Sequence, residues 1–138
     1  MPNPAVATVD FYSEQGSTFR RRLWYGWSTK PPEQVLSIAD IDEMYDLSEC
    51  EAQMYVRTYD RTTIVQKLTT ADGSIILNAV QGSIDLYVSA ADTDLWLDKK
   101  YRHDLELTYP PVLPATEGDI IKKYRGTIFN ELTNTRDA

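Results

Sequence analysis

The 138-residue chain contains one cysteine, Cys50, and one histidine, His103. A single cysteine excludes an intrachain disulfide, and so few ligands exclude metal sites assembled from several cysteines and histidines. No apolar run approaches the roughly 20 residues of a membrane-spanning helix. Residues 1–4 have neither the basic start nor the apolar core of a signal peptide. We therefore expect no membrane partner and a protein made and kept in a reducing cytosol.

Basic residues are also in deficit, because 14 Lys and Arg stand against 21 Asp and Glu, for a formal net charge of −7. Nucleic-acid binding needs a clustered basic face that releases counterions, so we expect no nucleic-acid partner. The length suits one domain, which can bury about two thirds of its unfolded surface without disulfides or a metal.

Apolar residues recur with period two along most of the chain, which indicates β-strands, whereas helical stripes are scarce. The repeated triplet Gly-Ser-Ile at 73–75 and 82–84 predicts a hairpin, and Ser89 predicts the start of one short helix. Both Cys50 and His103 fall in rows expected to face the core. The predicted strands cover residues 19–27, 50–57, 61–69, 75–77, 84–88, 101–107 and 120–132. About seven or eight strands of this kind indicate an all-β antiparallel sandwich or barrel.

The domain boundaries are predicted from the places where the alternation of apolar and polar residues stops. Residues 1–12 are interpreted as an extended N-terminal arm, and residues 133–138 as a flexible tail. The β domain spans residues 13–132. Within it, residues 28–45 form a long loop or insertion, with a short helix expected between 32 and 44.

Residue patterns for catalysis are weak. The pairs Asp40-x-Asp42 and Asp92-x-Asp94 lack the turn glycine of a calcium loop, and we interpret them as helix caps and solvated loops. Cys50 and His103 could make a nucleophile and its base, but their inward-facing positions favour a role in the core. Phosphate-binding loops and hydrolase elbows are missing from the sequence. We expect no enzyme and no cofactor; a small hydrolase using Cys50 or a carboxylate is the remaining catalytic alternative.

One basic and aromatic cluster is a candidate protein-binding surface. Arginine stacks on indole rings and forks onto carboxylates, so such clusters anchor interfaces; a plain charged sheet face is the other interpretation. Trp96 is expected to plug the core. The predicted partner-binding residues are Arg20, Arg21, Arg22, Trp24, Pro31 and Pro32.

Four stretches, read together, resemble one family. They cover most of residues 15–128, and their order and spacing matter more than any single motif. They are Gln15-Gly16-Ser17-Thr18-Phe19; Asp46-Leu47-Ser48-Glu49-Cys50-Glu51-Ala52-Gln53-Met54-Tyr55-Val56-Arg57; Asp72-Gly73-Ser74-Ile75 with Gly82-Ser83-Ile84-Asp85-Leu86-Tyr87-Val88-Ser89-Ala90-Ala91-Asp92-Thr93; and His103-Asp104-Leu105-Glu106-Leu107 with Tyr124-Arg125-Gly126-Thr127-Ile128. The chain resembles the small immunoglobulin-like β-sandwich proteins of tailed bacteriophages, such as the N-terminal domain of the upper baseplate protein. His103 replaces the usual tyrosine.

This resemblance implies an immunoglobulin-like sandwich and a non-enzymatic virion protein, assembled in the bacterial host cytoplasm. It implies an adaptor in the tail, baseplate, fibre base or neck that docks other phage structural proteins and copies of itself in a symmetric assembly. The family's functional surface is not a motif, so no site residue is transferred. The alternative is a carbohydrate-binding module that stacks host glycans on Trp24, Trp27 or Trp96.

Overall fold

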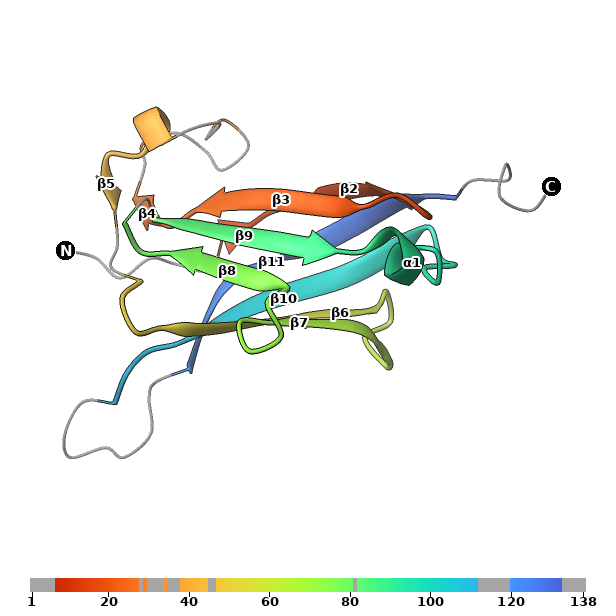
Figure 1. Cartoon of the computed structure of the whole chain (residues 1–138). Coiled ribbons are helices and arrows are strands. Elements are labelled where there is room, and N and C mark those ends of the chain that lie inside the picture. Colours follow the sequence, from red (N-terminus) through yellow and green to blue (C-terminus); the bar gives the residue numbers. More distant parts are fainter. Residues whose placement is uncertain are drawn as a thin grey trace.

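The computed structural model describes residues 7–27, 29, 34, 38–44, 47–80, 82–111 and 120–132. Its regular secondary structure is mostly strands, which form two facing sheets (Figure 1). The larger sheet contains β1 (Ala7–Thr8), β2 (Phe11–Glu14), β6 (Glu51–Thr58), β7 (Ile64–Thr69), β10 (Lys100–Thr108) and β11 (Ile120–Glu131). The smaller sheet contains β3 (Phe19–Trp24), β8 (Ile75–Asn78) and β9 (Ser83–Val88). Outside them lie the pair β4 (Gly26–Trp27) and β5 (Glu43–Met44), the 3-10 turn η2 (Ile38–Asp40) and the helix α1 (Ala90–Thr93).

The strand order identifies the sandwich type. The larger sheet runs β1-β11-β10-β6-β7, with β2 also paired to β11, and the smaller sheet runs β3-β9-β8. Along the chain, the strands therefore change sheet after β2, after β3, after β7 and after β9. This is the partition of an immunoglobulin domain, with β3, β9 and β8 as one sheet and β7, β6, β10 and β11 as the other. The predicted immunoglobulin-like antiparallel sandwich is confirmed.

A second immunoglobulin feature lies at the start of β10. The hydroxyl of Tyr101 accepts a hydrogen bond from the backbone N–H of Asp98 at 2.8 Å, and Tyr101 is 2% exposed. Immunoglobulin domains place a tyrosine at this corner, two residues before the second cysteine of their disulfide. His103 stands at that cysteine's position here, so packing must hold the two sheets together without a disulfide.

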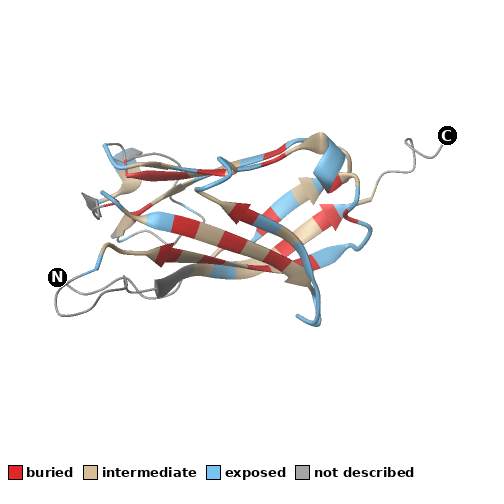
Figure 2. Ribbon diagram, turned by 60° about the horizontal axis from the view of Figure 1, so that its bottom comes forward, coloured by how far each residue is buried: buried red, intermediate tan, exposed pale blue. Residues whose placement is uncertain are grey.

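The core lies between the sheets, where the predicted alternation places it. Buried bands alternate along the strands with bands of intermediate exposure in Figure 2. Ala52, Met54 and Val56 point inward from β6, and His103 does so from β10. Trp96 is 1% exposed and packs against Phe19 and Tyr101, with ring centroids 6.0 and 5.7 Å away. The core role predicted for Trp96 is therefore confirmed.

The predicted hairpin and the predicted helix start are both confirmed. The hairpin joins β8 to β9, and Gly82 takes a φ of 69°, which suits a residue without Cβ. Ser89 caps α1 by accepting a hydrogen bond from the N–H of Asp92 at 3.2 Å.

Three predicted strand boundaries were wrong. The strand expected over residues 61–69 begins only at Ile64, as β7. Cys50 is not in a strand, because Leu47 to Cys50 forms a turn in which the N–H of Cys50 donates to the Leu47 carbonyl at 3.1 Å. Glu49 has a φ of 60° in this turn, and Leu47 fills the core in place of the half-buried Cys50. The strand expected over residues 19–27 also ends early. Tyr25 leaves the ladder as its N–H donates to the Gly82 carbonyl, and the chain then pairs as β4 with β5.

The predicted N-terminal arm was too long. Ala7 pairs with Tyr124 and Phe11 with Ile128 in a parallel ladder along β11, and Phe11 is 6% exposed. Residues 7–12 thus belong to the larger sheet, because β11 offers an open edge and Phe11 fills the core beside it. Residues 1–6, the tail 133–138, and Pro31 and Pro32 lie outside the described residues. In the expected helix between 32 and 44, the described part holds the short η2 turn followed by β5.

Candidate interaction surfaces

The outward side of the smaller sheet gathers three of the predicted partner-binding residues. Alternation along β3 turns Arg20, Arg22 and Trp24 to the same side. The Arg20 guanidinium lies 4.8 Å from the ring centroid of Tyr87, which is opposite it on β9. These residues, with Tyr87, Asp85 and Ile76, are called the Arg20 face below.

Arg22 is held in place by its neighbours on this face. Its Nε and Nη2 donate to the two carboxylate oxygens of Asp85 at 2.7 and 3.1 Å, and this hydrogen bonding raises the pKa of Arg22. The guanidinium also lies 5.6 Å from the ring of Trp24. Such forked pairing keeps a long side chain in one orientation, which lowers the entropy cost of docking.

The Arg20 face is hollowed and partly apolar. A hollow of about 340 Å³ is lined by residues that include Arg20, Arg22, Gly73, Ile76, Asp85 and Tyr87. Ile76 is 59% exposed, and Tyr87 is 39% exposed. Apolar and aromatic side chains beside arginine are typical of protein interfaces, where they form the buried centre.

Arg21 also lines part of this hollow, but alternation turns its side chain to the other side of β3. It is half-buried at the edge of the sandwich, its guanidinium lies 4.6 Å from the ring of Phe19, and it donates to the backbone carbonyl of Tyr12. Burial lowers the pKa of Arg21. Because Phe19 belongs to β3 and Tyr12 to β2, Arg21 joins the two sheets, and its contacts are structural. The Trp27 side chain is not among those described.

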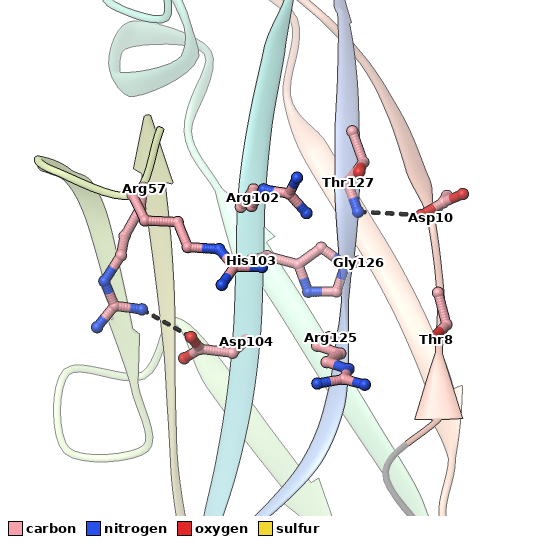
Figure 3. A pocket seen from close by; sticks show the side chains of 10 residues that line it. Thr8, Asp10, Arg57, Arg102, His103, Asp104, Arg125, Gly126 and Thr127 are labelled. Atoms are coloured by element: carbon pink, nitrogen blue, oxygen red, sulfur yellow. Dashed lines mark hydrogen bonds and ion pairs between the residues drawn. The ribbon is translucent and has the colours of Figure 1, made fainter. Parts of the chain in front are cut away.

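A larger hollow lies on the outward side of the other sheet, and sequence reasoning missed it. It measures about 620 Å³, and its lining includes Arg57, Arg61, Arg102 and Arg125 with Asp10 and Asp104 (Figure 3). We call it the arginine hollow. Its members are scattered over more than a hundred positions of the chain, so only the pairing of β6, β10 and β11 brings them together.

The floor of the arginine hollow depends on a close backbone approach. A Cβ built on Gly126 would lie 2.1 Å from the carbonyl oxygen of Val9, so only glycine lets the N-terminal segment cross here. The Asp10 carboxylate accepts a hydrogen bond from the N–H of Thr127 at 3.0 Å. The N–H of Val9 donates to the Arg125 carbonyl at 2.8 Å. These contacts fix the crossing between β1 and β2.

His103 secures the same crossing from inside. Its Nε2 lies 2.6 Å from the Val9 carbonyl oxygen, and because a carbonyl only accepts, the proton is on Nε2. Its Nδ1 is buried and has no hydrogen-bond partner among the described residues. The ring packs on Phe11 with centroids 4.8 Å apart, and burial lowers the pKa of His103. The imidazole is therefore neutral at pH 7 and serves packing.

The structure separates the two residues considered for nucleophilic catalysis. His103 lies opposite Val56 on β6, six positions along the chain from Cys50. At about 3.3 Å per extended residue this is roughly 20 Å, far beyond hydrogen-bond reach. The described residues contain no group of three or more histidine, cysteine or acidic side chains placed to hold a metal ion. No helix in that part of the chain is both long and apolar enough to span a membrane.

Comparison with known proteins identifies no family for this chain. No protein-family model matches the chain, and no curated protein matches it. A solved structure of the extracellular domains 3–5 of Drosophila OTK aligns with 92% of this chain and 32% of its own, at 14% sequence identity and a TM-score of 0.28. The chain thus spans about a third of that structure.

Proposed function

We propose that the protein is a non-enzymatic adaptor that docks another protein on its Arg20 face. In this proposal the rigid sandwich sets the direction of the contact, and the side chains of β3 and β9 provide it. Localisation in the virion of a tailed phage, at the tail, baseplate, fibre base or neck, is part of the same proposal. That setting is supported by the sequence resemblance across residues 15–128.

The observation that carries the proposal is the combination of held cations and exposed apolar surface on one face. Arg22 is oriented by Asp85, while Ile76 and Tyr87 leave large fractions of their side chains in water. A partner that covers them would bury apolar area at about 25 cal/mol per Å². Arginine and tyrosine are also the residues that most often dominate interface energies.

The carbohydrate-binding alternative loses its main support. Trp96 is 1% exposed and is enclosed by Phe19 and Tyr101, so it cannot stack on a sugar. Arg22 lies over the ring of Trp24, the second candidate. Of the described tryptophan side chains, Trp96 is buried and Trp24 has an arginine beside its ring.

The test is co-expression of the chain with the products of the genes beside its own, followed by affinity capture. We expect one of these products to be captured by the wild-type chain and by Lys99→Glu, a matched charge change at an exposed site outside the Arg20 face. Arg20→Glu should reduce capture at least tenfold while the thermal unfolding midpoint stays within about 2 °C, as for other exposed substitutions. Equal capture by the two variants, or capture of no neighbouring product, would contradict the proposal.

A further inference from the structure

The arginine hollow concentrates positive charge on an acidic protein. Four of the chain's eight arginines line it, and none of its lining residues is a lysine. They come from β6, from the turn after it, from β10 and from β11. Half of the arginines of a chain with a formal charge of −7 therefore surround one hollow of about 620 Å³.

Half of this positive charge is not balanced by carboxylates in the hollow, because four arginines stand against Asp10 and Asp104. Asp104 pairs with Arg57 at 2.7 Å, and Asp10 accepts the Thr127 N–H. Within the described part of the chain, Arg61, Arg102 and Arg125 make no ion pair with a carboxylate. Arg57 and Arg102 also occupy directly opposite register positions on β6 and β10, an arrangement that costs free energy when nothing neutralises it.

Two of the four guanidinium groups, those of Arg57 and Arg102, are held by neighbouring side chains and backbone. The Nε of Arg102 donates to the Tyr59 carbonyl at 3.1 Å, and its guanidinium lies 4.2 Å from the Tyr59 ring. Arg57 lies 4.7 Å from the Tyr55 ring. In Figure 3, Asp104 lies between Arg57 and Arg125, so the three side chains span neighbouring strands. Held cations lose little entropy when an anion binds.

The chemistry of the hollow selects carboxylates on a protein. Arginine forks match the two oxygens of a carboxylate. Arg57 already contacts one carboxylate in the hollow, donating a single hydrogen bond to Oδ2 of Asp104 at 2.7 Å. Nucleic acid is a poorer fit, because its many phosphates would extend beyond the hollow onto an acidic surface. A short acidic segment is attracted within a Debye length of about 8–10 Å and meets no such penalty.

We infer that the arginine hollow binds an acidic segment of a partner protein through its Asp and Glu carboxylates. The hollow lies on the larger sheet, whereas the Arg20 face lies on the smaller sheet. Binding of an acidic segment in the hollow is therefore a separate contact and does not depend on docking at the Arg20 face. A chain with both contacts would join two partners on opposite sides of the sandwich.

The test uses a fluorescein-labelled hexapeptide of alternating Asp and Glu, with an Asn and Gln hexapeptide as its neutral counterpart. Fluorescence anisotropy should detect the acidic peptide only, with affinity that falls as salt rises. Arg125→Gln and Arg102→Gln should each weaken binding about tenfold, as expected for loss of one charge-assisted contact. Lys99→Gln, the same charge change at an exposed site outside the hollow, should change it less than twofold.

Amide chemical shifts recorded with the unlabelled acidic peptide should move around Arg102 and Gly126. Arg125 is exposed, so its variant decides the outcome even if Arg102→Gln unfolds for lack of its Tyr59 contact. The inference is overturned by no binding at low salt, by equal binding of the neutral peptide, or by an equal loss in Lys99→Gln. Displacement of the peptide by equimolar inorganic phosphate, or tighter binding of a single-stranded oligonucleotide, would also overturn it, because the site would then select phosphate.

Discussion

Replacing Gly126 with alanine should detach the N-terminal strands from the larger sheet. The added Cβ would lie 2.1 Å from the Val9 carbonyl oxygen and 2.8 Å from its carbonyl carbon. Both atoms belong to backbone, so no side-chain rotation can relieve the clash. The segment between β1 and β2 has to move, and the hydrogen bond from His103 to Val9 moves with it.

The cost of Gly126→Ala follows from two contributions. Overpacking a tight site costs about 1–3 kcal/mol. Loss of the hydrogen bond between His103 and Val9 adds about 1 kcal/mol. The free energy of unfolding should therefore fall by about 2–4 kcal/mol, which for a chain of this size lowers the melting temperature by roughly 6–15 °C.

Urea unfolding followed by tryptophan fluorescence gives the free energy, and hydrogen exchange locates the change. Amides of β1 and β2 should exchange faster in Gly126→Ala, while those of β6 and β10 keep most of their protection. Gly73→Ala is the matched control, because a Cβ at residue 73 would meet nothing within 4 Å. Alanine would be strained there only by the backbone φ of 83°. A loss for Gly126→Ala no larger than for Gly73→Ala, or unchanged exchange in β1 and β2, would refute the reasoning.

Three further predictions concern single side chains. Because burial lowers the pKa of His103 below the unfolded value of 6.5, protons bind the unfolded chain first. The free energy of unfolding should therefore fall by up to about 1.4 kcal/mol for each pH unit below 6.5. Urea unfolding at about pH 5.5 and 7.5 should show a smaller difference between the two pH values in His103→Gln than in the wild type. An equal difference in the two proteins would contradict this role of His103. Trp96→Ala should cost about 3–5 kcal/mol in the same assay, and a loss below 1 kcal/mol would place Trp96 outside the core. Arg21→Gln should lower the melting temperature without affecting partner capture, whereas Arg22→Gln should weaken capture and leave melting nearly unchanged; the reverse pattern would exchange their roles.

Much of the fold was predictable because its signals are local. Alternation in β6 and β10 reports directly which side chains face the core, as Met54 and Leu105 illustrate. The hairpin turn and the cap at Ser89 have short-range chemistry that a sequence displays. The boundaries at Cys50 and Tyr25 were missed because tertiary contacts decide them: Leu47 competes for the core, and the Gly82 carbonyl draws Tyr25 out of the ladder.

The candidate surfaces were predictable only in part. Arg20, Arg22 and Trp24 are close in sequence and alternate, so a single strand suffices to place them on one face. Arg57, Arg102 and Arg125 are far apart, and their meeting depends on the register between three strands. Arg21 is an arginine like its two neighbours in sequence, but its side chain lies on the opposite side of the strand. A pattern of residue types therefore finds a surface when one element carries it, and misses a surface assembled by topology.

The most direct measurement is hydrogen–deuterium exchange of the chain alone and in complex with a co-expressed neighbouring product. If the sandwich is an adaptor that docks through its Arg20 face, exposed amides next to Arg20 and Tyr87 should gain protection on binding, and Arg20→Glu should abolish the gain. Protection confined to loops at the ends of the sandwich, with none along β3 and β9, would contradict docking through that face.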